Sequence, residues 1–258
     1  MSADTYTISV TRENFSKMLS LLKTFENVCV DCDIQSGTFR CRTNDRQAIV
    51  AMDLTSVLEH NNLSFSLIKN KVNLLKTFEV DDNVNLEDKT VVIESNESNN
   101  EFFDPLSRLS FRKPVQRYID NQFIIDDDFN TMLPISEDKL LFTYTFSHYM
   151  KKRISNISLG FQKETIDCIM AEGKALFKII TENKEDVSIV AKDITLNRDV
   201  GEKTFKYITL PFTLDVVSDL KLDCYQTNQS DVWICKFSQL FYGIPIIIYT
   251  KVKVTNAV

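Results

Sequence analysis

The sequence predicts an α+β protein made of two similar domains, each with two short helices packed on antiparallel sheets. The string Ile-Val-Ala-x-Asp-(Leu/Ile)-Thr occurs at 49–55 and again 140 residues later at 189–195. A turn signal precedes each copy at nearly the same offset, Ser36-Gly37 in one half and Glu172-Gly173 in the other. Most of the remaining chain alternates with a period of two, and four stretches have helical spacing.

From this repeat we predict an N-terminal domain at 1–118, a connector at 119–138 and a C-terminal domain at 139–258. In the first half we expect helices at 12–25 and 67–78 and strands at 5–10, 28–35, 38–43, 47–54, 83–87, 90–95 and 107–118. In the second half we expect helices at 147–158 and 212–220 and strands at 139–145, 160–170, 174–182, 187–196, 204–210, 221–227, 231–238 and 244–254. The strands follow from alternating polarity bounded by turn residues.

Bulk composition excludes several classes of protein. The 258 residues include no apolar run of about 18, so we expect no membrane span. The N-terminus has no charged-then-apolar signal pattern, and we expect a cytoplasmic location. Glycine and proline occur only five times each, which argues against long linkers and glycine-rich phosphate loops.

The chain is acidic overall, with 36 acids, 30 bases and a net charge of −6. Its pI near 5.1 argues against indiscriminate coating of nucleic acid. DNA binding is still possible if the bases are segregated onto one surface, so their distribution along the helices becomes the question.

Helix 12–25 has one apolar stripe and a basic opposite face. Thr11 is placed to cap its start, because a side-chain oxygen there accepts a bond from a first-turn N–H. The stripe consists of Phe15, Met18, Leu19 and Leu22, and the opposite side of Ser16, Lys17, Ser20, Lys23 and Thr24. No acid occurs between Asn14 and Phe25. The face is either basic by chance or directed at phosphate.

Two further helices share this character. We expect helix 67–78 to bury Leu67, Leu74, Leu75 and Phe78 and to expose Lys69, Asn70, Asn73, Lys76 and Thr77. Lys71 falls on the apolar side, so either its stem is buried and its amine exposed or the helix begins later. We expect helix 147–158 to bury Tyr149, Met150, Ile154 and Ile157 and to expose Lys151, Lys152, Ser155, Asn156 and Ser158, with Arg153 near the stripe.

The fourth helix, 212–220, is acidic, with Asp215 and Asp219 among its polar positions and Lys221 just beyond it. Three acid-free basic helices in an acidic protein nevertheless favour a common surface that faces phosphate.

No arrangement of residues suggests catalysis, a metal site or a cofactor. The six cysteines lie among alternating apolar residues, as reduced buried thiols do. Cys29 and Cys32 form a C-x-x-C, but on a strand they point to opposite faces, and no second pair follows at zinc spacing. Only two histidines occur, His60 and His148. We predict no catalytic residue, no metal ligand and no cofactor.

Two surface segments leave alternatives open. The connector is unusually apolar, so its side chains either pack onto the sheets or form a docking strip. Residues 96–104 suggest a mobile loop, followed by Arg108, Arg112, Lys113 and Arg117. These bases suit the solvent side of an edge strand better than a nucleic-acid patch.

Several strings, in their order and spacing, resemble the DNA sliding clamps. They are Ser36-Gly37-Thr38-Phe39, helix 67–78 running into Val80-Asp81-Asp82, Ala171-Glu172-Gly173-Lys174, and Gly201-Glu202-Lys203-Thr204-Phe205. The resemblance covers nearly the whole chain and is strongest to the clamp of tailed bacteriophages, the polymerase processivity factor. The two-domain length also resembles proliferating cell nuclear antigen, the eukaryotic clamp. A phage origin implies the cytoplasm of the host cell.

The resemblance implies a homotrimeric ring around duplex DNA, with helices lining the hole and sheets continuing across subunit boundaries by edge-strand pairing. It implies DNA binding without sequence specificity by Arg12, Lys17, Lys23, Lys69, Lys76, Lys151, Lys152, Arg153 and Lys221. It further implies that DNA polymerase and a clamp loader dock through short apolar peptides. That pocket would comprise Phe123, Ile125 and Leu133 of the connector with Ile246, Ile247 and Ile248.

Other functions remain open at this stage. A polymerase or transcription accessory factor of the same fold would not form a ring. A replication nuclease would need a catalytic constellation that the sequence does not offer. A virion structural protein is a further possibility.

Overall fold

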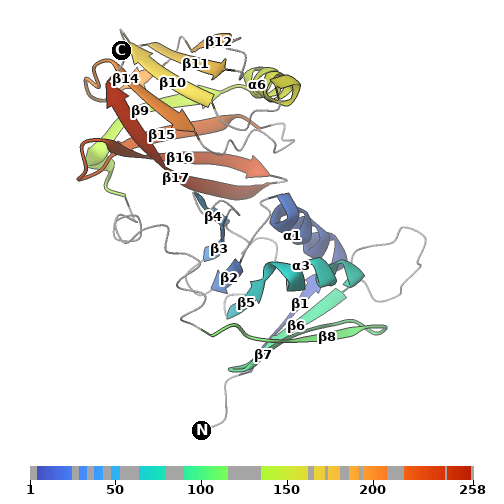
Figure 1. Ribbon diagram of the computed structural model, residues 1–258. Helices are drawn as coiled ribbons and strands as arrows, with labels where there is room; N and C mark the ends of the chain where they lie inside the picture. Colours follow the sequence, from blue (N-terminus) through green and yellow to red (C-terminus); the bar gives the residue numbers. More distant parts are fainter. Residues whose placement is uncertain are drawn as a thin grey trace. The chain divides into compact units, whose positions relative to one another are not determined.

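In the computed structural model the chain divides into two compact units, Met1–Ile124 with Tyr242–Ile246, and Ile125–Phe241 with Ile247–Val258 (Figure 1). The structure describes residues 5–24, 29–33, 38–42, 48–52, 64–78, 90–115, 135–161, 166–171, 174–180, 186–191, 194–207, 218–241 and 243–256. The predicted domain limits stay predictions, because most of the connector lies outside these ranges.

Unit 1 contains β1 (Tyr6–Thr11), α1 (Arg12–Thr24), β2 (Cys29–Asp33), β3 (Thr38–Arg42), β4 (Ala48–Met52), β5 (Ser64–Ile68), α3 (Lys69–Leu74), the 3-10 helix η1 (Leu75–Phe78), β6 (Thr90–Ser95), β7 (Asn99–Phe103) and β8 (Arg108–Arg112). One sheet has the antiparallel order β1-β6-β7-β8. The remaining strands of unit 1 also pair antiparallel: β2 pairs with β3 and β5, and β3 pairs with β4.

Unit 2 contains the 3-10 helix η2 (Glu137–Lys139), β9 (Leu140–Phe146), α6 (His148–Phe161), β10 (Ile166–Ala171), β11 (Lys174–Ile180), β12 (Asp186–Ala191), β13 (Thr195–Leu196), β14 (Lys203–Tyr207), β15 (Leu220–Gln226), β16 (Val232–Phe241) and β17 (Ile244–Asn256), whose first three residues are assigned to unit 1. The strands follow the order β12-β11-β10-β14-β17-β16-β15-β9-β13.

The two units repeat one pattern of strand pairing. The order β1-β6-β7-β8 in unit 1 has its counterpart in β9-β15-β16-β17 of unit 2. The pairs of β2 with β3 and β5 correspond to those of β10 with β11 and β14. The first residues of the repeated string, 49–51 and 189–191, lie on equivalent strands, β4 and β12. The duplication predicted from the sequence is therefore a duplication of topology.

The core of unit 1 lies between α1 and the inner face of its four-stranded sheet. Alternate residues of the strands are buried there, because successive side chains of a strand point to opposite faces: Ile8, Val10, Val91, Ile93, Phe102 and Phe111. Phe15 of α1 lies at the centre, with its ring centroid 6.0 Å from that of Phe78 and 6.3 Å from that of Phe102. Of the predicted stripe, Phe15, Met18 and Leu19 are fully buried, and the side chain of Leu22 lies outside the described residues.

The core of unit 2 lies beneath α6. Phe146 packs with its ring centroid 4.7 Å from Tyr144 and 5.0 Å from Phe177, and Ile154 of the helix is fully buried. Cys168, Cys224 and Cys235 are buried and not joined in disulfides. Burial raises the pKa of Cys224, so the thiol stays protonated and unreactive. The side chains of Cys29, Cys32 and Cys41 lie outside the described residues.

Four predicted elements need correction. The helix expected at 67–78 begins at Lys69, because 64–68 form β5 beside β2. The segment expected as a loop at 96–104 holds β7, whose buried Asn100 accepts a 3.0 Å bond from Ser95 Oγ. The strand expected from 160 begins at Ile166, since α6 continues to Phe161. Most of 212–220 lies outside the described residues, and its last residue already belongs to β15.

Among the described residues, none of the helices has the length and apolar content needed to cross a membrane.

Candidate nucleic-acid interface

Each unit starts its first helix directly after a strand, with a hydroxyl residue at the junction. In unit 1 the Asn14 backbone N–H donates to Thr11 Oγ1 over 3.3 Å, which confirms the predicted cap. In unit 2 the Met150 N–H donates to Ser147 Oγ over 3.3 Å, and the His148 N–H donates to Asp219 Oδ1 over 3.1 Å. A carboxylate at this end also suits the helix dipole. These caps fix where both basic helices begin.

Two of the predicted cations of unit 1 have solvent-accessible side chains. Lys76 is exposed on η1, which packs beside α1 through the Phe15–Phe78 contact. Lys17 of α1 is one-third exposed, and its Nζ lies 2.7 Å from Glu13 Oε1. The hydrogen bond and charge of Lys17 lower the pKa of Glu13. Because exposed ion pairs are weak, Lys17 remains available to a phosphate that displaces Glu13.

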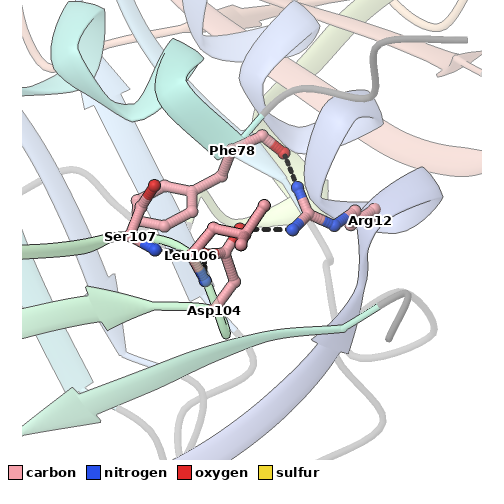
Figure 2. A network of polar contacts seen from close by, with 5 residues as sticks. All are labelled: Arg12, Phe78, Asp104, Leu106 and Ser107. Carbon is pink, nitrogen blue, oxygen red and sulfur yellow. Dashed lines mark hydrogen bonds and ion pairs between the residues drawn. The ribbon is translucent and has the colours of Figure 1, made fainter. Parts of the chain in front are cut away.

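Arg12 was expected on the exposed basic face, and the structure buries it instead. Its side chain is 8% exposed and forms an ion pair with Asp104, which is 3% exposed. Its second terminal nitrogen donates to the carbonyl of Phe78 over 3.4 Å (Figure 2). The reason is a buried acid 92 residues away in the sequence, which helical periodicity does not reveal.

Lys151 was also expected to face solvent and is buried. Its amine donates to the carbonyl of Ser218, just before β15. Burial lowers the pKa of Lys151, and the nearby charge of Asp219 partly opposes that shift. Its neighbours Lys152 and Arg153 are exposed on α6 and supply the accessible positive charge of that helix.

The other predicted cations are less informative. Lys23 and Lys69 lie in α1 and α3, and their side chains are outside the described part of the chain. Lys221 lies on β15 rather than beside a helix, with Nζ 2.9 Å from Asp223 Oδ2. The structure thus brings Lys17 and Lys76 onto the helices of unit 1 and Lys152 and Arg153 onto that of unit 2.

Two apolar side chains expected inside are exposed, Leu74 at 49% and Tyr149 at 73%. At Leu74 the α-helix tightens into the 3-10 turn of η1, which has three residues per turn. Leu75 and Phe78, three apart, therefore share the buried face. In α6 the two residues are reversed relative to the prediction, since Lys151 is buried and Tyr149 is exposed.

The predicted peptide-docking residues are only partly placed. Phe123, Ile125 and Leu133 lie outside the described residues. On β17 the side chains of Ile246 and Ile248 are buried, and Ile247 between them is half-buried. Of these three isoleucines, Ile247 has the most accessible surface.

Sequence reasoning missed the acids that partner the buried cations. Asp104 precedes Pro105 and Ser107, a typical turn sequence, and its Oδ1 accepts the N–H groups of Leu106 (2.9 Å) and Ser107 (2.6 Å). That signal predicts the turn but not the ion pair with Arg12. Asp219 was placed inside a helix, and it caps another one instead.

Edge strands are a second feature of both units. Among the described strands, β8 ends the sheet of unit 1 and β12 ends that of unit 2. Arg108 of β8 donates to Glu101 through Nε over 2.9 Å and lies over the ring of Phe103, while Arg112 is exposed. The bases of β8 thus lie on an edge strand, the interpretation favoured from the sequence.

Comparison with known proteins identifies solved structures that share this architecture. No protein-family model matches the sequence. No curated protein matches it either. Among solved structures, proliferating cellular nuclear antigen from Entamoeba histolytica superposes with a TM-score of 0.57 at 12% identity, covering 96% of this chain and 98% of that one. The chain has the fold of proliferating cell nuclear antigen.

A second solved structure, the PCNA2–PCNA3 complex from Sulfolobus tokodaii, gives a TM-score of 0.53 at 12% identity and covers 96% of this chain and 99% of that one. Both superpositions span the two domains. The fold class predicted from the sequence, α+β with two repeated clamp-type domains, is confirmed.

Proposed function

We propose that this chain is a DNA sliding clamp, a ring-forming processivity factor that encircles duplex DNA and tethers polymerase and other replication proteins. The observation that carries the proposal is the placement of accessible cations on helices of both units, in a chain whose net charge is −6. These cations are Lys17, Lys76, Lys152 and Arg153. Lys23, Lys69 and Lys221 complete the proposed set.

The chemistry of these side chains suits sliding. Lysine and arginine attract phosphates irrespective of base sequence, and salt screens the attraction, so a ring held this way moves along DNA. Hydrogen bonds to base edges would instead hold it at one position. We leave Arg12 and Lys151 out of the proposed phosphate contacts, because their charged groups already bind Asp104 and the Ser218 carbonyl.

We place the subunit boundary of a homotrimer at β8 of one copy and β12 of the next. The outer backbone groups of an edge strand are a template for pairing with another chain. β12 has six residues and an exposed Val190, whereas β13, at the other end of its sheet, has only two residues. β8 carries Arg108 and Arg112, and β12 begins with Asp186, so the two strands contain residues of opposite charge. Head-to-tail joints of this kind form a closed ring when the rotations between successive copies add up to a full turn.

The remaining parts of the proposal follow the resemblance to clamps. We assign the protein no catalytic activity, and we retain the likeness to clamps of tailed bacteriophages, which implies a viral protein in host cytoplasm. Polymerase and clamp loader dock through short apolar peptides on the strip formed by the connector residues Phe123, Ile125 and Leu133 with Ile247.

Light scattering of the purified protein tests the ring. A homotrimer has about three times the 29.8 kDa mass of the chain. A monomer or dimer at all concentrations would instead favour the non-ring accessory factor of the same fold.

A pull-down tests the proposed docking site. The double variant Phe123→Ala with Ile125→Ala should capture less polymerase or clamp loader than the wild type does. Undiminished capture would remove the connector from the docking site.

A further inference from the structure

The buried pair Arg12–Asp104 joins three elements of unit 1. Arg12 is the first residue of α1, and its guanidinium binds the Asp104 carboxylate in the turn between β7 and β8. The same guanidinium donates to the carbonyl of Phe78, the last residue of η1. Figure 2 shows Arg12 reaching both acceptors from one side. A single side chain therefore connects both helical segments to one hairpin.

The two carboxylate oxygens of Asp104 accept hydrogen bonds from different groups. Oδ1 accepts the N–H groups of Leu106 and Ser107 and so shapes the turn. Oδ2 accepts the guanidinium of Arg12. The turn is also closed by a 2.9 Å bond from the Asp104 N–H to the Ser107 carbonyl. Because the turn has its own bonds, the pair with Arg12 serves to attach the formed turn to the helices.

This attachment bears on β8, the strand that follows the turn. β8 is bordered by β7 on one side only among the described strands. Near its far end Phe111 is buried, with its ring centroid 6.0 Å from that of Phe102, and Lys71 Nζ of α3 lies 5.6 Å from it. Near its first end Arg108 is exposed. There its side-chain contacts, to Glu101 and Phe103 of β7, stay within the same hairpin. This end of β8 is therefore joined to α1 and η1 through the pair in the turn.

We propose that the Arg12–Asp104 pair holds the edge strand β8 in place against α1 and η1, so that Arg12 is a positioning residue for the subunit boundary. The boundary itself rests on the proposed function, whereas the attachment of β8 to α1 and η1 within unit 1 does not. A buried charge that loses its partner is strongly destabilising, so the hairpin and helix separate locally when the pair is broken. The surface that joins subunits is then coupled to the helix that carries Lys17.

Hydrogen exchange of Asp104→Asn tests the fastening. Asparagine keeps a carbonyl oxygen for the turn and removes the charge that binds Arg12. Amide exchange at 106–110 should accelerate by roughly tenfold or more, while exchange at 90–95 in β6 changes little. Glu101→Gln is the matched control, since it makes the same change on the same hairpin but its partner Arg108 is 63% exposed. Unchanged exchange at 106–110 in Asp104→Asn would overturn the proposal.

The oligomeric state tests the consequence. If the wild type forms a ring, Asp104→Asn should dissociate at a protein concentration roughly tenfold higher than the wild type and Glu101→Gln should not. A ring of unaltered stability with a loosened β8 would overturn the role at the boundary. A wild type that never oligomerises would refute the ring of the proposed function. The exchange data would still decide whether the Arg12–Asp104 pair holds β8 in place within unit 1.

Arg12→Lys provides the second variant if Asp104→Asn does not fold. Lysine keeps one positive charge beside Asp104 and loses the fork that also reaches the Phe78 carbonyl. Exchange at 106–110 should rise relative to the wild type. An increase confined to 75–78, with none at 106–110, would contradict the proposed link.

Discussion

At the residue scale, Arg12 and Lys151 show what periodicity does not reveal. Both occupy positions that a helical wheel assigns to the basic face. In the structure each is buried, because its partner comes from a distant part of the sequence, 92 residues away for Asp104 and 67 for the Ser218 carbonyl. By contrast, Thr11 was predictable as a cap because its partner lies three residues away.

The buried amine of Lys151 predicts a pH dependence of stability. Burial lowers its pKa in the folded chain below the ordinary value of 10.5. Between the two values the unfolded chain binds a proton that the folded chain does not, so stability rises with pH there. The free energy of unfolding of the wild type relative to Lys151→Met should therefore increase as pH approaches 10.5. Denaturant unfolding across this range measures it.

Lys152→Met is the control for this experiment. It removes a neighbouring lysine from the same helix whose side chain is exposed to solvent. A difference between wild type and Lys151→Met that stays constant from neutral to alkaline pH would contradict the prediction.

At the scale of elements, long periodic segments were predictable and their junctions were not. Helix α1 and strands such as β6 and β11 fall close to the predicted ranges, because a continuous pattern of 3.6 or 2 determines them. β7 was missed because its first residues are asparagines, and its place in the sheet comes from pairing with β6 and β8. Tertiary pairing overrides local propensity in such a segment.

The junction of α3 and η1 gives a prediction with an internal control. Leu75 is fully buried and Leu74 is 49% exposed, although both were expected inside. Leu75→Ala should lower the free energy of unfolding by about 2–5 kcal/mol, as buried leucines do. Leu74→Ala removes the same atoms from the surface and should cost less than about 1 kcal/mol. Urea unfolding compares them, and equal losses would refute the 3-10 turn at this point.

At the scale of the whole molecule, the sequence predicted the duplicated fold and the helices that carry the candidate site. The exposed cations Lys76, Lys152 and Arg153 were identifiable because they lie in stretches free of acids. Of the strands available as edges, β8 was indicated by its bases, whereas nothing in its own residues marked β12 as an edge. An edge is defined by the partners a strand lacks, and those depend on the order of all strands in the sheet.

The proposed interface predicts a specific response to salt. Lys76→Gln, Lys152→Gln and Arg153→Gln together should weaken binding to duplex DNA equally for unrelated sequences, because phosphate contacts carry no sequence information. The slope of log affinity against log salt concentration should become shallower by about one for each phosphate that the variant no longer neutralises. Fluorescence anisotropy at several salt concentrations gives both quantities.

The matched control changes three lysines on strands, Lys174, Lys236 and Lys253, to glutamine. It alters the net charge by the same amount, so a general effect of charge would change the slope equally in both variants. If the helices carry the phosphate contacts, only the helix variant loses slope, while light scattering shows the same assembly for both. Equal slopes in the two variants would remove the helices from the DNA interface, because the response would then report total charge rather than its placement.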